Sequence, residues 1–245
     1  MTEEIKARGI CLRTTDYGEN DRIMTLLTDE KGKIAVRARG VTSAKSKLRH
    51  AATPFAFGEY ILSVRNGYYT LRTFDYLDSF PPISENIVRY YCGAAALETV
   101  DKLDEGGVPD VEEFARLLRF LTDLCYGGGN EGDFILFVLD MLMICGYGVS
   151  EGASQTGLSA KNYVFDLEEG GFVPQEKKGG NYVRLTADAA SLFLSYIAGE
   201  RPSQPASCSI AEILSLLSLY IRLKTGNNVH SYFELSNLLK GDLLS

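Results

Sequence analysis

Hydrophobic and polar positions alternate with a period of two along most of the first 80 residues. The stretches DRIMTLLT and KIAVRARG flank the turn DEKG, in which Gly32 can adopt a positive φ. A second pair, GEYILSVR and YYTLRTFDYLD, flanks Asn66-Gly67, the preferred two-residue type I′ turn. With IKARGICLRTT at the front, about five strands precede the first helical pattern. Such a set predicts a small closed barrel of the OB-fold type.

The pattern changes to a helical period at Pro81-Pro82, which ends the last strand. We expect helices at about 84–104, 110–126, 131–145, 186–198, 209–225 and 230–239. Asn130 follows the glycines of YGGGN and can cap the third helix, while Ser209 and Glu212 form a capping box for the fifth. The segment 146–182 is irregular and rich in glycine, with one hairpin-like piece, KNYVFDLEEGGFVPQ. The predicted class is therefore α+β, with an OB-fold domain over 1–80 and a mainly helical domain over 81–245.

Charge is divided unevenly between these two parts. Residues 1–80 hold 13 Lys/Arg and 10 Asp/Glu, a net of +3, whereas residues 81–245 hold 12 and 22, a net of −10. From Lys31 to Arg49 there are seven Lys/Arg and no acid. A solvated face usually mixes both signs, so this concentration favours a surface that binds a polyanion.

Alternation in KIAVRARG places the cations on one face of a strand and Ile34, Val36 and Ala38 on the other. In the second hairpin, the turn pairs Arg65 with Tyr68, Ser63 with Thr70 and Ile61 with Arg72, which leaves Phe74 on the same surface as the arginines. Cations beside aromatic rings suit single-stranded nucleic acid, because charge follows the phosphates and rings stack on bases. The predicted DNA-binding residues are Lys33, Arg37, Arg39, Lys45, Lys47, Arg49, Arg65, Tyr68 and Arg72.

The residues offer little to a catalytic interpretation. His50 and His230 are the two histidines, and neither lies in a nucleophile motif. The glycines of GYGVSEG follow a helix instead of a strand, which is the wrong context for a dinucleotide site. The acids of DYGENDR either hold a cation or form a solvated turn, and the five scattered cysteines are expected to be buried thiols. We therefore expect a protein that is not an enzyme and has no cofactor.

No apolar run approaches the roughly 20 residues that cross a bilayer, and the acidic start MTEEIKARG lacks the apolar region of a secretory signal. We expect a cytoplasmic protein with no membrane partner.

The stretch from ARGICLRTTDYGENDRIMTLLTDEKGK to KLRHAATPF resembles the RecO family of bacterial DNA repair proteins. That family has a strand leading into D-Y-x-E-x-D, a T-L-x-T hairpin ending in G-K, and a basic strand with a K-S loop before P-F. In the second half of the chain, the hairpin EEGGFV and the closing stretch YIRLKTGNNVHSYFELSNLL resemble that family more loosely. The resemblance implies an OB-fold, a helical domain, and a nucleoid-associated mediator that binds and anneals single-stranded DNA and helps load recombinase in the RecF pathway. Whether duplex DNA also binds is left open.

Many members of that family carry a zinc-binding C-x-x-C-G … G-G-x-x-C-x-x-C segment in the second domain. Here Ala153, Thr156, Pro174 and Lys177 stand at the four ligand positions. None of them supplies a thiolate, and tetrahedral Zn²⁺ needs four good ligands. The segment 146–182 is therefore expected to be a degenerate zinc finger that holds no metal.

Partners implied by the resemblance are the recombination protein RecR and the acidic C-terminal tail of the single-strand DNA-binding protein. We assign that tail to a groove flanked by Arg222 and Lys224, although these cations equally suit the C-terminal end of a helix. The alternative function is an interaction adaptor whose basic barrel binds an acidic peptide, and a weaker third is an enzyme with a degenerate motif.

Overall fold

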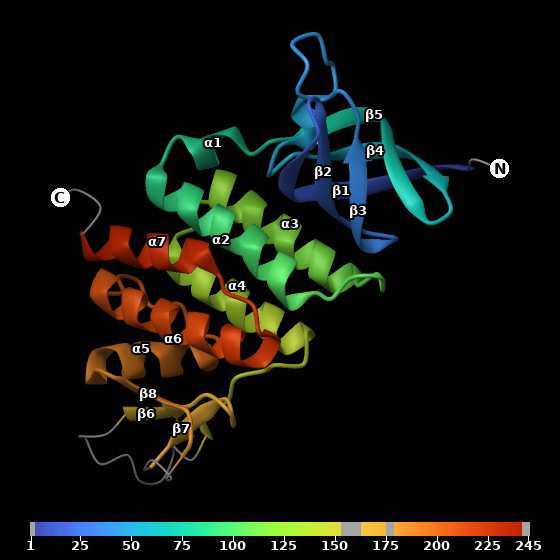
Figure 1. Ribbon diagram of the computed structural model, residues 1–245. Helices are drawn as coiled ribbons and strands as arrows, with labels where there is room; N and C mark the ends of the chain where they lie inside the picture. The colour runs from blue at the N-terminus through green and yellow to red at the C-terminus, as the bar shows by residue number, and fades with distance from the viewer. Residues whose placement is uncertain (1–2, 153–162, 175–178, 242–245) are drawn as a thin grey trace.

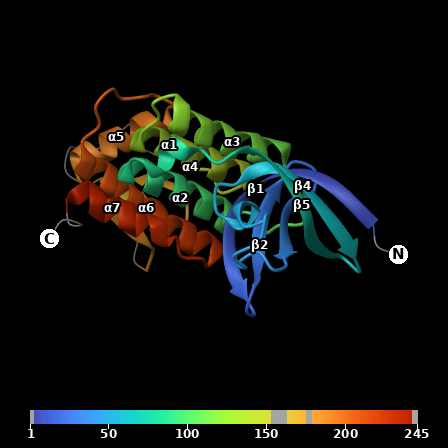
Figure 2. The same cartoon turned by 90° about the horizontal axis from the view of Figure 1, so that it is seen from above.

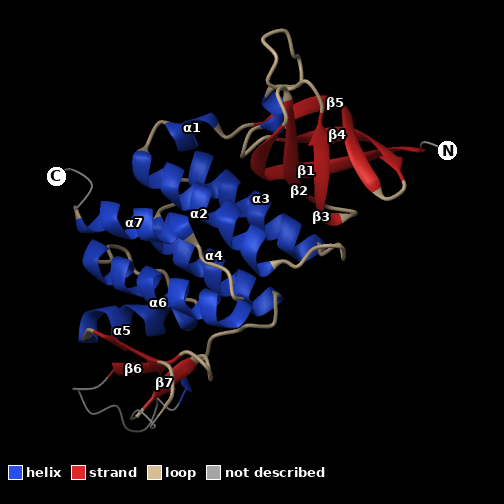
Figure 3. Cartoon of the chain, viewed as in Figure 1, coloured by secondary structure: helices blue, strands red, loops and turns tan. Residues whose placement is uncertain are grey.

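The computed structural model describes residues 3–152, 163–174 and 179–241. A β-barrel lies at one end of the molecule, a stack of helices fills the middle, and a small sheet lies at the other end (Figure 1; Figure 3). This arrangement confirms the predicted α+β class.

Five strands close the barrel in the order β1-β2-β3-β5-β4, which is the strand order of an OB-fold. Only β3 and β5 pair in parallel, and the other neighbours are antiparallel. Alternate side chains of β3 are buried, so the period seen in the sequence is the period of the barrel wall. The strands are β1 Glu3–Tyr17, β2 Asp21–Thr28, β3 Gly32–Ala38, β4 Phe57–Arg65 and β5 Tyr68–Asp78, with a short 3-10 helix, η1, at His50–Ala52.

Both predicted hairpin turns are present. Asn66 and Gly67 have φ values of 51° and 79°, the two positive angles of a type I′ turn. Gly32 has a φ of 62°, and a Cβ there would lie 2.5 Å from the carbonyl oxygen of Val108. Glycine is therefore needed at position 32 for two reasons: the turn requires a positive φ, and the backbone of Val108 lies too close for a side chain.

The β4–β5 hairpin keeps the predicted register only near its turn. Ser63 pairs with Thr70 as expected, but Ile61 pairs with Thr73, so the predicted pairing of Ile61 with Arg72 is wrong. A β-bulge at this point inserts Arg72 as an extra residue in β5.

The bulge also changes the direction of the residues that follow it. Phe74 pairs with Tyr60, a residue buried inside the barrel, and the two ring centroids lie 4.5 Å apart. The prediction that Phe74 lies on the outer surface is therefore wrong, because the extra residue shifts the alternation by one position.

Helices occupy most of the chain after Phe80, and the six predicted from the periodicity are confirmed. Asn130 caps α4, as its position after the glycines predicted. It does so in a capping box with Asp133, which was not predicted. The helices are α1 Pro81–Ser84, α2 Ile87–Leu103, α3 Val111–Tyr126, α4 Glu131–Ile144, α5 Ala187–Ile197, α6 Ser207–Thr225 and α7 His230–Lys240.

The predicted capping box of α6 is wrong. This helix begins at Ser207, before Ser209, and no side chain caps its first turn. Glu212 instead accepts hydrogen bonds from the backbone N–H and the hydroxyl of Thr186, the residue that caps α5. A carboxylate in mid-helix thus connects two neighbouring helices.

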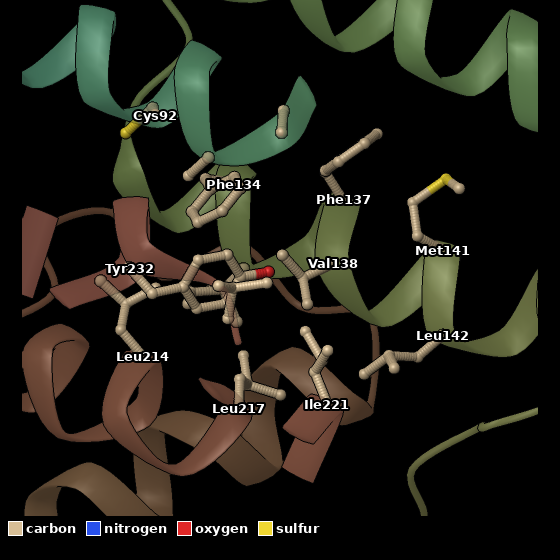
Figure 4. Close-up of a cluster of buried hydrophobic side chains, with 14 of the residues drawn as sticks. Cys92, Phe134, Phe137, Val138, Met141, Leu142, Leu214, Leu217, Ile221 and Tyr232 are labelled. Atoms are coloured by element: carbon tan, nitrogen blue, oxygen red, sulfur yellow. The ribbon is translucent and has the colours of Figure 1, made fainter. Parts of the chain in front are cut away.

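The helices enclose a large apolar core between α2, α4, α6 and α7 (Figure 4). Phe134 and Tyr232 meet edge to face with ring centroids 5.4 Å apart. The buried hydroxyl of Tyr232 lies 2.8 Å from Thr99 Oγ1, so burial of this ring leaves no polar atom without a partner.

A three-stranded sheet packs on the far side of the helices. It comprises β6 Tyr163–Asp166, β7 Gly171–Val173 and β8 Tyr182–Leu185, in the order β7-β6-β8. The pairing of β6 with β7 confirms the predicted hairpin, whereas β8 was not predicted. Phe165 and Phe172 pack edge to face and join the helical core through Phe193.

One face of the barrel rests against the helices (Figure 2). Ile10, Leu12 and Leu27 lie on the outside of the barrel and belong to the same buried cluster as the helices. The strands give way to helices near residue 80 as expected, and whether the two parts fold as separate domains stays a prediction. The helices do not cover the opposite wall of the closed barrel (Figure 2), and we call this uncovered side the open wall.

Candidate nucleic-acid interface

The basic strand β3 has the two faces that its sequence predicts. Ile34, Val36 and Ala38 are buried inside the barrel, whereas Ala35 is exposed on the outside. Its cations therefore lie on the outer surface, and their contacts determine which of them remain available to a ligand.

Lys33 lies at the junction with the helices. Its ammonium group donates hydrogen bonds to the backbone carbonyls of Asp101, at 2.7 Å, and of Asp104. These two carbonyls belong to the C-terminal end of α2, where unpaired carbonyls attract a cation. Lys33 thus fastens the barrel to the helical part and is not brought together with the other predicted DNA-binding residues.

Arg37 is exposed in part, but an acid neutralises it. Its guanidinium lies 2.7 Å from the carboxylate of Asp21 and 4.9 Å from the ring centroid of Tyr17. The other carboxylate oxygen of Asp21 accepts a hydrogen bond from the backbone N–H of Gly40 at 2.8 Å. This bond and the Arg37 guanidinium hold the pKa of Asp21 below its ordinary value, so the acid stays charged near neutral pH.

The loop between β3 and β4 projects from the barrel at the top of Figure 1. Its base is fixed to the β1–β2 turn, where the Thr42 N–H donates to the Asn20 carbonyl at 3.2 Å. Arg49 donates to the carbonyls of Thr42 and Ser43, which closes the loop upon itself. We call the four cations of this segment the basic loop: Arg39, Lys45, Lys47 and Arg49.

Three cations of the basic loop form no ion pair or hydrogen bond with any residue that the structure describes: Arg39, Lys45 and Lys47, all exposed. The charge of Arg39 still interacts with Asp21, whose pKa it helps to lower. Lys45 and Lys47 are therefore the cations most free to meet an anion from solution.

The β4–β5 hairpin supplies the aromatic part of the site. Tyr68 is 78% exposed, the most exposed large apolar residue among those described, and Arg65 beside it is exposed as well. Arg72 projects from the bulge, also exposed. Neither arginine has an ion-pair partner in the described part of the chain.

The parallel pairing of β3 with β5 connects these two groups. Val36 pairs with Tyr69 and Arg37 with Thr70, so the basic strand and the aromatic hairpin are neighbours in the barrel. Tyr68 and Arg65 lie toward the other end of the same wall, at the hairpin turn. The open wall thus has a basic end at the loop and an aromatic end at the turn.

Tyr17 belongs to this surface, although the sequence analysis missed it. It is 52% exposed, and its ring supports the Arg37 guanidinium. The residue stands among acids in DYGEND, so only the pairing of β1 with β2 could have placed it beside a basic strand.

The acids of DYGENDR serve the arginines of the barrel. Asp16 pairs with Arg22 at 2.9 Å and Asp21 with Arg37. Within the described ranges, no group of three His, Cys, Asp or Glu is arranged to hold a metal ion. The solvated turn is therefore the interpretation that the contacts support.

The two predicted partner-binding cations differ in their surroundings. Lys224 donates to the Glu168 carbonyl at 2.7 Å and lies over the Tyr220 ring, so it attaches the β6–β7 turn to α6. Arg222 is exposed in the last turn of α6. Their role in partner binding stays a prediction.

The degenerate zinc segment is described only in part. Pro174 follows β7, whereas Ala153, Thr156 and Lys177 lie outside the described residues. All five cysteines are free. Cys11, Cys92 and Cys125 are buried as expected, but Cys145 is only half-buried and the expectation is wrong for Cys208, which is exposed. That the segment holds no zinc stays a prediction, which metal analysis of the purified protein tests.

The described part of the chain thus combines a closed five-stranded barrel of OB type, which carries exposed cations and the exposed ring of Tyr68, with a helical bundle. Comparison with known sequences agrees with this architecture: the family described as "Recombination protein O N terminal" matches residues 1–80. The DNA repair protein RecO of Bacillus pumilus is 34% identical over 70% of this chain and 67% of its own length. The RecO protein of an Exiguobacterium strain is 30% identical over 77% of this chain and 76% of its own length. The RecO protein of Bacillus subtilis is 36% identical over 57% of this chain and 54% of its own length.

The chain belongs to the RecO family. Membership supports a role in DNA repair and recombination. No helix of the described part is long and apolar enough to cross a membrane.

Proposed function

We propose that this chain is a non-enzymatic recombination mediator that binds single-stranded DNA through the open wall of the barrel. It promotes pairing of complementary strands and helps load recombinase. The observation that carries this proposal is that exposed cations of the basic loop and the exposed ring of Tyr68 lie at the two ends of one wall of an OB-type barrel. Charge follows the phosphates, and each base stacked on an aromatic ring adds about 1–3 kcal/mol.

Annealing follows from the same charges. Two complementary strands repel each other through their phosphates, and cations that hold both strands lower this repulsion until bases can pair. The acidic helical part, with its net charge of −10 over residues 81–245, is the poorer surface for DNA and the better one for proteins. Partners proposed for it are the recombination protein RecR and the acidic tail of the single-strand DNA-binding protein.

Strand annealing tests the proposal directly. Two complementary oligonucleotides that carry a fluorescence donor and acceptor are mixed with and without the protein at several salt concentrations. We expect faster annealing at low salt, and a loss of this acceleration in the Lys45→Ala/Lys47→Ala protein. An equal rate with and without the wild-type protein would refute annealing, and displacement of DNA by an acidic peptide at equal affinity would favour the adaptor alternative.

The tail partner has its own test. Because Lys224 is engaged with Glu168, Arg222 is the better candidate for a carboxylate from solution. We expect Arg222→Ala to weaken binding of a peptide that carries the acidic tail, whereas Arg119→Ala, which removes an exposed cation from α3, leaves it unchanged. Equal binding by the Arg222→Ala and wild-type proteins would remove the proposal.

A further inference from the structure

A pocket of about 420 Å³ opens where the connection from α2 to α3 meets the end of α4. In Figure 1 this connection lies beside the junction with the barrel, at the right of the helices. Every charged residue that lines the pocket is an acid, namely Asp104, Glu105, Asp110 and Glu113. The pocket is therefore strongly anionic, unlike the open wall of the barrel.

Two of these acids have a buried oxygen without a hydrogen-bond partner. Among the described residues four buried side-chain polar atoms lack a partner, and two of them are Asp104 Oδ2 and Glu113 Oε1. Glu113 is only 3% exposed. A buried carboxylate without a partner costs free energy, and in a native protein it calls for an explanation such as a ligand.

No cation among the residues that the structure describes donates a hydrogen bond to these two oxygens. Lys33 comes nearest, but its ammonium group donates to the backbone carbonyls of Asp101 and Asp104 and forms no hydrogen bond with either carboxylate. The other oxygen of Asp104 accepts from the Gly106 N–H at 2.6 Å, and Asp110 accepts from the first N–H groups of α3. The backbone thus holds Asp104 and Asp110 in place, while one buried oxygen each of Asp104 and Glu113 has no hydrogen-bond partner.

Apolar side chains surround the acids. Ile144 and Tyr147 line the pocket, and Val108 does so while 76% exposed. Val111 and Met143, each next in sequence to a residue of the lining, are also largely exposed. Exposed apolar residues gathered around a pocket mark a site for protein association.

The donor set favours an organic cation over a metal. No group of three His, Cys, Asp or Glu in the described part of the chain is arranged for a metal ion. Two carboxylate oxygens within an apolar rim instead suit the ammonium or guanidinium of a lysine or arginine, whose aliphatic stem can lie along the rim.

We propose that this acidic pocket docks a segment of another protein that inserts a lysine or arginine between Asp104 and Glu113 and packs apolar side chains on Val108 and its neighbours. Charge complementarity selects this occupant, because nucleic acid is repelled by the four acids of the lining. The helical part would then bind a basic segment at this pocket, in contrast to the acidic tail proposed to bind near Arg222.

A labelled peptide that alternates leucine with arginine, acetylated and amidated, serves as the probe in fluorescence anisotropy with the full chain. Peptides in which glutamate replaces arginine, or serine replaces leucine, are the matched controls. We expect the leucine–arginine peptide to bind and both controls to bind far more weakly, because each lacks one of the two complementary features. Absence of binding by the leucine–arginine peptide, or equal binding of the glutamate peptide, would overturn the proposal.

Two variants assign the binding to the pocket. Glu113→Gln keeps the shape of the side chain but cannot ionise to meet a docked cation, and we expect it to weaken the leucine–arginine peptide by about thirtyfold or more, as loss of one partner of a buried charge pair does. Glu112→Gln removes a neighbouring carboxylate that is 68% exposed and is expected to change the affinity by less than about twofold. Equal effects of the two variants would mean attraction by overall charge and would overturn the proposal. Stabilisation of wild-type protein but not of Glu113→Gln by Mg²⁺ alone would replace the docked segment with a metal.

Discussion

Arg37 of β3 and Asp21 of β2 form a salt bridge of 2.7 Å between two neighbouring strands of the barrel. The bridge holds a basic residue of the candidate interface against an internal acid, with the ring of Tyr17 beneath it. A phosphate that binds Arg37 must therefore compete with Asp21.

We expect Asp21→Asn to tighten binding of single-stranded DNA at low salt. The amide oxygen still accepts the Gly40 N–H, while the charge that opposes phosphate is removed. One further cation free to release counterions should steepen the slope of log K against log salt by about 0.7. A salt titration checks this, and Asp16→Asn is the control, because it removes the acid paired with Arg22 while Arg22 keeps its hydrogen bond to the Ala52 carbonyl. A salt slope that steepens equally in both variants would show that the Asp21–Arg37 pair does not limit phosphate binding by Arg37.

The basic loop should contribute the largest share of phosphate binding. Lys45 and Lys47 have no internal partner among the described residues, so Lys45→Ala/Lys47→Ala is expected to reduce the salt slope by up to about 1.4, which is two contacts. Lys33→Ala is the informative comparison, since Lys33 is engaged with α2. We expect it to lower the melting temperature and to leave the slope unchanged. A slope reduced by Lys33→Ala but not by the loop variant would contradict this assignment.

Tyr68 should act by stacking, because its ring is almost fully exposed and releases no counterion. We expect Tyr68→Ala to weaken binding by about 1–3 kcal/mol with an almost unchanged salt slope. Phe233→Ala removes another exposed ring, 66% accessible, from α7 in the helical part and should have no effect on DNA affinity. Equal binding by Tyr68→Ala and wild-type protein would exclude the ring from the interface.

Burial, together with the nearby charges of Asp104 and Asp110, raises the pKa of Glu113 to about 8, and the opposing effect of Lys33 is smaller. The folded protein thus retains a proton that the unfolded chain releases near the ordinary pKa of 4.5. The contribution of Glu113 to stability is complete below that value and is lost as pH rises toward about 8.

We therefore expect the wild-type free energy of unfolding, taken relative to Glu113→Gln, to fall between these two pH values by up to about 1.4 kcal/mol per pH unit. Urea unfolding of both proteins across this pH range measures the difference. A difference that rises with pH would mean that Glu113 has found a cationic partner within the chain.

The barrel and its helices were predictable because the signals are local. The alternation in β3, the turn at Asn66-Gly67 and the cap at Asn130 each depend on a few consecutive residues, and all three are confirmed. The bulge at Arg72 was not predictable in this way, since it depends on how β4 and β5 pack against the rest of the barrel. The wrong placement of Phe74 follows from that single extra residue.

The candidate site was harder to predict because contacts between distant segments decide which charges are free. Lys33 and Arg37 have the same pattern in the sequence as the loop lysines. Lys33 is held by the carbonyl of Asp101 in α2, 68 residues further along the chain, and Arg37 is held by Asp21 on the neighbouring strand β2. Glu113 gave no sequence signal, because its burial comes from the junction of three elements.

The most direct test of the account is the affinity of the full chain for one unstructured, labelled DNA strand, measured by fluorescence anisotropy at several salt concentrations. We predict binding whose log K falls linearly with log salt, with a slope of about −2 or steeper, since three or more free cations each contribute about 0.7. The absence of binding at low salt, or an affinity independent of salt, would contradict the conclusion that the open wall of the barrel binds single-stranded DNA.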